Sequence, residues 1–148
     1  MNRGFSLIEL LTVVAIVGIL ASVGIVSYNS YVWSTKKTSV KNIMQQMSLA
    51  QTEYISNTGS NFESLTPDAC KEGKATKTQS TEINTRLLES ETLDPDKLKF
   101  NLCVLDTSND DPYISDYTII AWAVDGTKKC KLQMHSNGSW EKDTGELC

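Results

Sequence analysis

Apolar residues are concentrated at the start of the chain. Residues 10–26 carry no charge and consist of Leu, Val, Ile, Ala and Gly, apart from Thr12 and Ser22. Joined to Phe5–Ile8, this segment is long enough to cross a hydrocarbon layer of ~30 Å as an α-helix. Arg3 precedes it and favours a cytoplasmic N-terminus. The pattern therefore predicts one membrane-spanning helix at the start of the chain.

The residues after the apolar run distinguish this span from a cleaved secretory signal. Such a signal has a shorter apolar region and ends in small residues of the Ala-x-Ala type. Here the run is longer, and Tyr28, Tyr31 and Trp33 follow it, as aromatic residues do at a membrane interface. The span is therefore expected to stay in the mature protein.

Beyond Tyr28 the pattern of apolar residues becomes that of an amphipathic helix, with one apolar face. They recur at steps of three and four residues, which places them on one face of a helix: Val40, Ile43, Met44, Met47, Ala50 and Tyr54. Gly59 is suited to the left-handed conformation that ends a helix. We expect the helix to continue from the span to about residue 58, with its second half packed on a core.

The rest of the chain is polar and then strand-like. Before the strands, we expect a surface segment from residue 59, a short helix over Thr81–Ser90 and a turn or helix start at Asp94-Pro95. The predicted strands are Lys99–Leu105, Tyr117–Val124 and Lys128–His135, the last two joined by an Asp125-Gly126 turn. The expected fold is α+β, with a long N-terminal helix packed on a small antiparallel sheet.

The net charge and the four cysteines limit the class of protein to which the chain can belong. The 148 residues carry a net charge of −4, which argues against nucleic-acid binding as the main task. Cys70, Cys103, Cys130 and Cys148 form no Cys-x-x-Cys pair, and no His lies at ligand spacing. All four lie beyond the apolar segment, so we expect two disulfides in an oxidising compartment. The sequence leaves all three pairings open.

Glu9 is a carboxylate inside the apolar segment. Such a group typically costs about 2.5–3.5 kcal/mol at mid-bilayer, and less toward an end. A position in the first helical turn, at the positive end of the helix dipole, explains part of this. A cationic partner explains it better. Cleavage after Gly4 would free an amino group on Phe5, one turn from Glu9 on the same chain or within reach of a neighbouring one.

These residues resemble a known family. Gly4-Phe5-Ser6-Leu7-Ile8-Glu9-Leu10 and the apolar run after it are similar to the class III signal of type IV pilins and pseudopilins. The resemblance implies cleavage by a prepilin peptidase between Gly4 and Phe5, N-methylation of Phe5, and a role for Glu9 in subunit register. Many members carry proline where this chain has Val26. We therefore expect a more continuous helix across Ala21–Val26 in the assembled state.

The end of the chain resembles the C-terminal region of disulfide-bearing pilins more loosely. That likeness implies a Cys130–Cys148 bond and, by exclusion, Cys70–Cys103. With the N-terminal resemblance and the apolar pattern, three segments are expected: a leader at 1–4, a transmembrane and filament-core helix at 5–27, and a head at 28–148. The head divides into an amphipathic helix at 28–58, a connecting loop region at 59–97 and a sheet at 98–148.

The resulting expectation is a non-enzymatic structural subunit of a type IV pilus without a cofactor. Its implied partners are other pilin subunits, the prepilin peptidase and an inner-membrane assembly platform. It would wait in the bacterial inner membrane with its head in the periplasm and then join an extracellular filament that serves adhesion, twitching motility or DNA uptake. The alternatives are a type II secretion pseudopilin and a minor pilin that binds DNA or a host surface.

Other candidate chemistry is sparse. His135 lacks the neighbours of a catalytic triad or metal site. The acidic stretch 106–111 lacks the glycine of a calcium loop, so a solvated turn explains it better. Lys128, Lys129 and Lys131, near two tryptophans, are candidates for contact with DNA phosphates. The simpler interpretation is a solvated hairpin whose lysines protect an exposed strand.

Overall fold

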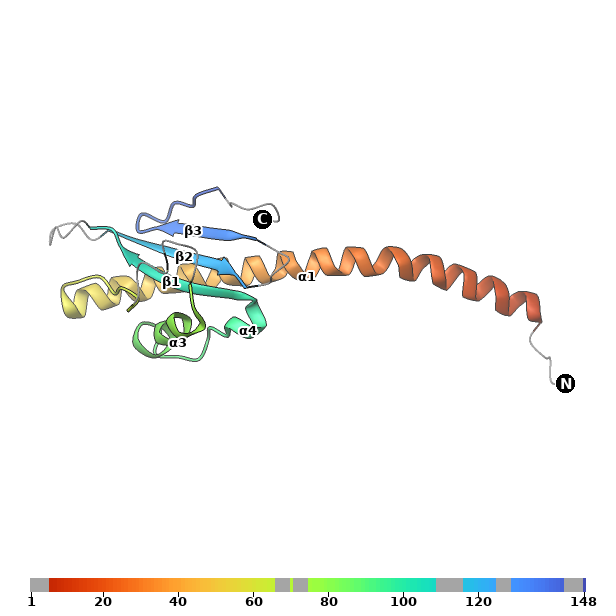
Figure 1. Ribbon diagram of the computed structural model, residues 1–148, viewed down its shortest axis with the longest axis horizontal. Helices are drawn as coiled ribbons and strands as arrows, with labels where there is room; N and C mark the ends of the chain where they lie inside the picture. The colour runs from red at the N-terminus through yellow and green to blue at the C-terminus, as the bar shows by residue number, and fades with distance from the viewer. Residues whose placement is uncertain (1–5, 66–69, 71–74, 109–115, 125–128, 143–147) are drawn as a thin grey trace. The chain divides into compact units, whose positions relative to one another are not determined.

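The structure is a computed structural model, and it describes residues 6–65, 70, 75–108, 116–124, 129–142 and 148. The chain divides into two compact units, Met1–Thr35 and Lys36–Cys148. Helix α1, Leu7–Thr58, is the element that both units share (Figure 1). Residues 1–5, 66–69, 71–74, 109–115, 125–128 and 143–147 lie outside the described residues.

In the first unit, α1 is an uninterrupted α-helix. It passes through Gly18 and Gly24 without a break, although each glycine costs a helix roughly 0.5–1 kcal/mol relative to alanine. The described apolar side chains from Leu7 to Ile25 are exposed. The helix is thus continuous across Ala21–Val26 in the single chain, and its form in an assembled state remains a prediction.

In the second unit, α1 contributes one face to the core. Val40, Ile43, Met44 and Met47 are buried, as the spacing predicts. Ala50 and Tyr54 are only half-buried, and the buried position on this part of the helix is the polar Gln51. The helix ends as predicted.

The end of α1 and the start of the following segment are held by short-range contacts. Gly59 takes a φ of +76°, and its N–H donates to the Ile55 carbonyl at 2.8 Å. This is the left-handed stop that glycine adopts without steric cost.

The described strands form one three-stranded antiparallel sheet in the order β1-β2-β3. They are β1 Phe100–Asp106, β2 Tyr117–Ala123 and β3 Lys131–His135 (Figure 1). β2 is central and almost wholly buried over its first five residues. The later part of α1 is tied to β2 by a 2.8 Å hydrogen bond between the Ser48 and Tyr117 hydroxyls. The expected α+β fold, a long helix on a small antiparallel sheet, is confirmed.

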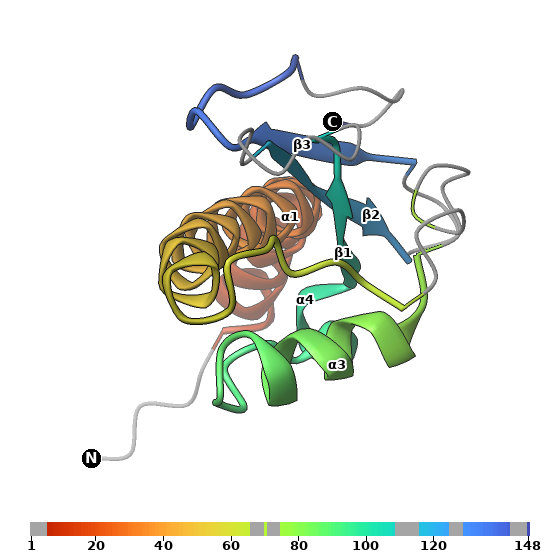
Figure 2. The same ribbon diagram turned by 90° about the vertical axis from the view of Figure 1, so that its left-hand side faces the viewer.

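Two elements differ from the prediction by more than one residue at a boundary. The short helix expected over Thr81–Ser90 is α3, Lys77–Arg86, which starts earlier because Thr76 and Gln79 form a capping box. The third strand begins at Lys131 rather than Lys128, and the Asp125-Gly126 turn lies outside the described residues. Both α3 and the short helix α4, Pro95–Leu98, contact β1 (Figure 2).

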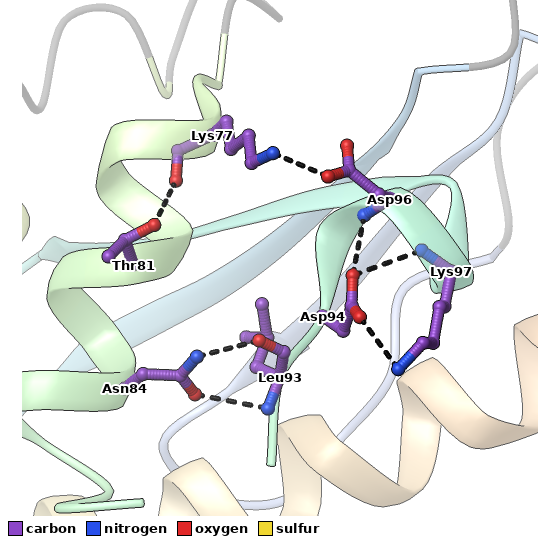
Figure 3. A network of polar contacts seen from close by, with 7 residues as sticks. All are labelled: Lys77, Thr81, Asn84, Leu93, Asp94, Asp96 and Lys97. Carbon is purple, nitrogen blue, oxygen red and sulfur yellow. Dashed lines mark hydrogen bonds and ion pairs between the residues drawn. The ribbon is translucent and has the colours of Figure 1, made fainter. Parts of the chain in front are cut away.

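Polar contacts join α3 to α4 (Figure 3). The Asn84 side chain bonds both backbone groups of Leu93, accepting from its N–H at 3.0 Å and donating to its C=O at 2.6 Å. Asp94 caps α4 by accepting from the N–H groups of Asp96 and Lys97, and an ion pair joins Lys77 to Asp96. The Lys97 ammonium and these N–H groups lower the pKa of Asp94.

Two disulfides lie in the second unit. Cys70 is bonded to Cys103 on β1, with Cα atoms 6.0 Å apart. Cys130 is bonded to Cys148, with Cα atoms 5.0 Å apart. These are the pairings that the family resemblance implied, from the three that the sequence left open.

Candidate functional site

Glu9 closes the first turn of α1. Its Oε2 accepts the Ser6 N–H at 3.0 Å, while the Ser6 carbonyl accepts the N–H groups of Glu9 and Leu10 at 3.1 and 3.2 Å. A Glu at the third helical position that reaches back to the cap residue is half of a capping box. The acid therefore has a local role at the helix start, as its place near the positive end of the dipole suggested.

This hydrogen bond does not saturate the Glu9 carboxylate. An ionised carboxylate offers about four lone-pair sites, and one bond to a neutral amide uses only one of them. The side chain is exposed in the single chain, so its other sites are open to solvent or to a cation. In water this costs nothing, but in an apolar surrounding the remaining charge needs a partner.

The helix after Glu9 presents an apolar surface on all sides. Twelve large aliphatic side chains between Leu7 and Ile25 are each 50–80% exposed. The most apolar stretch of α1 has a mean hydropathy of 2.6 and no burial within the chain, and α1 is long and apolar enough to cross a membrane. At about 1.5–3 kcal/mol for each buried side chain, removing this surface from water is worth on the order of 20 kcal/mol. The segment therefore requires lipid or another apolar partner.

The hydroxyl groups of Thr12 and Ser22, inside the apolar segment, form hydrogen bonds with backbone carbonyls of the same helix. The Thr12 hydroxyl donates to the carbonyls of Ile8 and Glu9, at 3.1 and 3.0 Å, and the Ser22 hydroxyl donates to Ile19 at 2.8 Å. Hydroxyls bonded to the preceding turn add no open donor to an apolar surrounding. Glu9 is therefore the group of this segment whose charge still needs a partner.

The other predicted site residues fall into two groups: some lie outside the described residues, and the rest are either exposed or in contact with the sheet. Gly4, Phe5 and Lys128 lie outside the described residues. Lys129 is exposed, while the Lys131 ammonium lies 5.6 Å from the centre of the Trp122 ring, directly across the β2–β3 pair. The Trp122 indole N–H also donates to the Cys70 carbonyl at 3.2 Å. Lys131 is thus engaged within the sheet.

The second tryptophan of the expected basic cluster belongs to another contact. Trp140 faces the Lys41 ammonium of α1 at 5.4 Å, and the Lys37 ammonium donates to the Cys148 carbonyl. Two lysines of α1 therefore hold the C-terminal segment. Sequence reasoning missed them because about a hundred residues separate each pair and no local pattern marks the contact.

His135 and Asp106, the first residue of the acidic stretch, make structural contacts, while residues 109–111 of that stretch lie outside the described residues. The His135 ring bonds the Thr118 hydroxyl at 3.3 Å and faces the Glu141 carboxylate at 3.4 Å. Asp106 is partly desolvated, but hydrogen bonds from Ser108 and from Asn61 outweigh the desolvation and lower its pKa. Within the part of the chain that the structure describes, no three His, Cys, Asp or Glu side chains are grouped to hold a metal ion.

These features define a class: a protein with an apolar, membrane-compatible N-terminal helix and a separate disulfide-bonded α+β unit. Comparison with known proteins gives a more specific likeness for the chain. The family model described as the prokaryotic N-terminal methylation motif matches residues 1–25. Over this N-terminal segment the chain is similar to the type IV pilins.

Curated relatives match stretches of 55–59 residues of this chain. The fimbrial protein EcpC of Eikenella corrodens is 38% identical over 58 residues, 39% of this chain and 38% of the relative. The type IV major pilin PilA of Myxococcus xanthus is 40% identical over 55 residues, 37% of this chain and 25% of the relative. The type IV major pilin PilE1 of Neisseria gonorrhoeae is 39% identical over 59 residues, 40% of this chain and 36% of the relative.

The chain thus matches between a quarter and two-fifths of the length of these relatives. No solved structure matches it. The likeness to these relatives therefore covers at most 40% of the chain.

Proposed function

We propose that the chain is a structural subunit of a type IV pilus that polymerises through the apolar half of α1. The observation that carries the proposal is an apolar surface, exposed on all sides, with one incompletely satisfied carboxylate at its start. Packing such helices together replaces lipid contact with protein contact, while the polar second units remain outside. Before assembly the helix would span the inner membrane, with the head in the periplasm.

Processing would produce the cation that Glu9 needs. In this proposal a prepilin peptidase removes residues 1–4, the new N-terminal Phe5 is methylated, and segment 5–27 forms the filament core below the head at 28–148. The match to the N-terminal methylation motif supports these steps. The amino group of Phe5 then lies one turn from Glu9 on its own chain, or meets the Glu9 of a neighbour.

The two pairings of Glu9 have different consequences. A contact within the chain lowers the cost of burying the acid, which is about 2.5–3.5 kcal/mol at mid-bilayer. A contact between chains also fixes the axial register, because only one offset brings the amine to the carboxylate. The Ser6–Glu9 bond supports the second role, since it holds the carboxylate in place while leaving other lone pairs open.

The test compares Glu9→Ala with Glu53→Ala in the source bacterium. Glu53 is the other glutamate of α1 and is exposed. We expect Glu9→Ala to be processed and retained in the membrane but to yield at least tenfold less sheared filament, whereas Glu53→Ala polymerises like wild type. Mass spectrometry of the mature chain should show an N-terminus at methylated Phe5. Wild-type filament yield from Glu9→Ala, or a mature chain that retains residues 1–4, would refute the proposal.

A deletion strain separates the pilus from the secretion alternative. We expect loss of surface filaments and, with them, of adhesion, twitching motility or DNA uptake. A protein-export defect with unchanged surface filaments would instead identify a type II secretion pseudopilin, and the presence of the chain in small amounts among sheared filaments would identify a minor pilin.

DNA contact by the lysines near the third strand is tested separately. We expect a Lys128/Lys129/Lys131→Glu variant to keep its filaments. Reduced DNA retention on those filaments would support contact with DNA phosphates, and unchanged retention would exclude it.

A further inference from the structure

Contacts around the end of β2 bring lysines from three parts of the second unit together. At the start of β2 the Tyr117 hydroxyl bonds Ser48, whereas the last residue of β2 donates its N–H to the Cys130 carbonyl at 2.9 Å. The disulfide partner of Cys130 is Cys148, whose carbonyl accepts from the Lys37 ammonium. Since Lys37 precedes Ser48 on α1, β2 runs opposite to α1 and ends near the residue at which α1 enters the second unit (Figure 1).

Three lysines at this end have no carboxylate partner among the described residues: Lys36, Lys99 and Lys129. They are together called the basic end. Lys99 lies beside the residue that follows β2, since its carbonyl accepts the Val124 N–H at 2.9 Å. Lys36 and Lys129 each precede a residue that the contacts above place here. Lys99 and Lys129 are exposed, and Lys36 is half-buried.

The acids near the basic end leave a local excess of positive charge. Asp94 and Asp96, at α4, are each ion-paired with a lysine other than these three. In the sequence Asp125 follows β2, and Lys128 in the same segment offsets its charge; both lie outside the described residues. The whole chain carries a net charge of −4, so the basic end is opposite in sign to the chain as a whole. Such a patch attracts anions.

Neither the backbone nor the membrane topology accounts for these lysines. Lys99 takes a φ of +62° at the end of α4, a conformation that glycine or asparagine adopts more readily. In the proposed orientation, Lys36, Lys37 and Lys41 lie on the periplasmic side, within about 15 residues of the end of the span. Lysine and arginine near a span are usually in excess on its cytoplasmic side, where residues 1–4 contain one, Arg3. The position of the lysines therefore points to an anion on the periplasmic side.

The nearest anions on that side are the phosphates of the lipid headgroups. Lys36 follows Tyr31 by five residues, about 7.5 Å along a helix, and Tyr28 and Tyr31 are exposed aromatic residues of the kind found at a membrane interface. The headgroup layer adds about 5–7.5 Å on each side of the hydrocarbon core. A lysine can extend its ammonium into that layer along a flexible stem. We propose that the basic end binds anionic phospholipid headgroups in the periplasmic leaflet of the inner membrane before assembly.

This inference rests on the membrane residence in the proposed function but not on polymerisation, so it is tested on the full-length chain in phosphatidylcholine bilayers. Electron paramagnetic resonance measures how much spin-labelled phosphatidylglycerol is held at the protein, compared with spin-labelled phosphatidylcholine. We expect phosphatidylglycerol to be preferred about fivefold, the factor that one lysine near a membrane surface contributes. The preference should fall as the salt concentration rises from about 0.01 M to about 1 M and the Debye length shortens. Equal association of the two lipids would overturn the proposal.

Substitutions locate the lipid. The test variant replaces the three lysines of the basic end: Lys36→Gln/Lys99→Gln/Lys129→Gln. Its preference for phosphatidylglycerol should fall below about half of the wild-type value. The matched control lowers the net charge by the same amount at exposed positions of α1: Gln45→Glu/Gln46→Glu/Thr52→Glu. These positions begin about 13 Å further along the helix than Lys36, beyond a Debye length of about 8 Å at physiological ionic strength, so the control should keep the wild-type preference.

The outcomes separate this inference from the proposed function. An unchanged preference in the test variant, or an equal loss in the control, would overturn lipid contact at the basic end. A test variant that keeps the lipid preference but yields fewer filaments would show that these lysines face another subunit instead. A lost preference with wild-type filament yield would support the lipid contact, and a chain that does not insert into bilayers would refute the membrane residence on which both proposals rest.

A folding control accompanies the test variant. If it unfolds at a lower temperature than wild type in near-ultraviolet circular dichroism, the measurement is repeated with Lys99→Gln and Lys129→Gln singly, since both positions are exposed. Each single variant should lower the preference for phosphatidylglycerol. Wild-type preference in both would overturn the proposal.

Discussion

Gln51 is a buried polar residue in the stripe of α1 that faces the core, and its replacement tests how the head is held together. Its side chain is fully buried and bonds both backbone groups of Phe62, accepting from the N–H at 3.0 Å and donating to the C=O at 2.8 Å. Phe62 itself is 1% exposed. The amide thus completes the backbone hydrogen bonding of the segment that follows α1.

Gln51→Leu should destabilise the head although leucine is apolar and forms helix as well as glutamine does. The substitution leaves a buried N–H and a buried C=O without partners, each of which costs about 1–3 kcal/mol. Because the leucine recovers some apolar burial, we expect a net loss of about 2–4 kcal/mol. The thermal midpoint should fall by roughly 10–20 °C for a unit of this size.

The assay is unfolding of the full-length chain in detergent, followed by near-ultraviolet circular dichroism. The matched control is Gln46→Leu, the same change at an exposed position of the same helix, which should alter stability by no more than about 0.5 kcal/mol. A loss below about 1 kcal/mol for Gln51→Leu, or one equal to that of the control, would refute the reasoning. It would mean that water or relaxed backbone satisfies Phe62.

Three further predictions concern the second unit. Replacing Cys130 and Cys148 by serine opens a loop with a sequence separation of 18 and should cost about 3 kcal/mol in urea unfolding; unchanged stability would contradict the chain-entropy argument. The lowered pKa of Asp94 means that its stabilising contribution is present above its ordinary value of 3.8 and is lost as the pH falls through the lowered value. Asp94→Asn should therefore flatten the pH dependence of stability below about pH 4, and an unchanged profile would contradict the cap. Lys99→Gly relieves a φ of +62° and should stabilise the unit by about 0.5–1 kcal/mol in thermal unfolding, whereas a loss would show that the lysine side chain contributes more than the strain costs.

Local patterns predicted most elements because their causes are local. The period of α1, its glycine stop and the β-branched run of β2 follow from side-chain spacing and backbone preference at neighbouring positions. The start of α3 depends on a local signal other than apolar spacing: Thr76 followed three residues later by Gln79 forms a capping box.

The sequence by itself determined the apolar span, the isolated acid at its start and the α+β order of the elements. Each of these depends on residues within a few positions of one another. Only the tertiary structure decided that Gln51 is buried on Phe62, that Lys41 lies against Trp140, and that the basic end gathers lysines from α1, the end of α4 and the segment before β3. Such contacts join residues that are near in space but not marked by any local period, so the folded chain has to bring them together before their chemistry can be recognised.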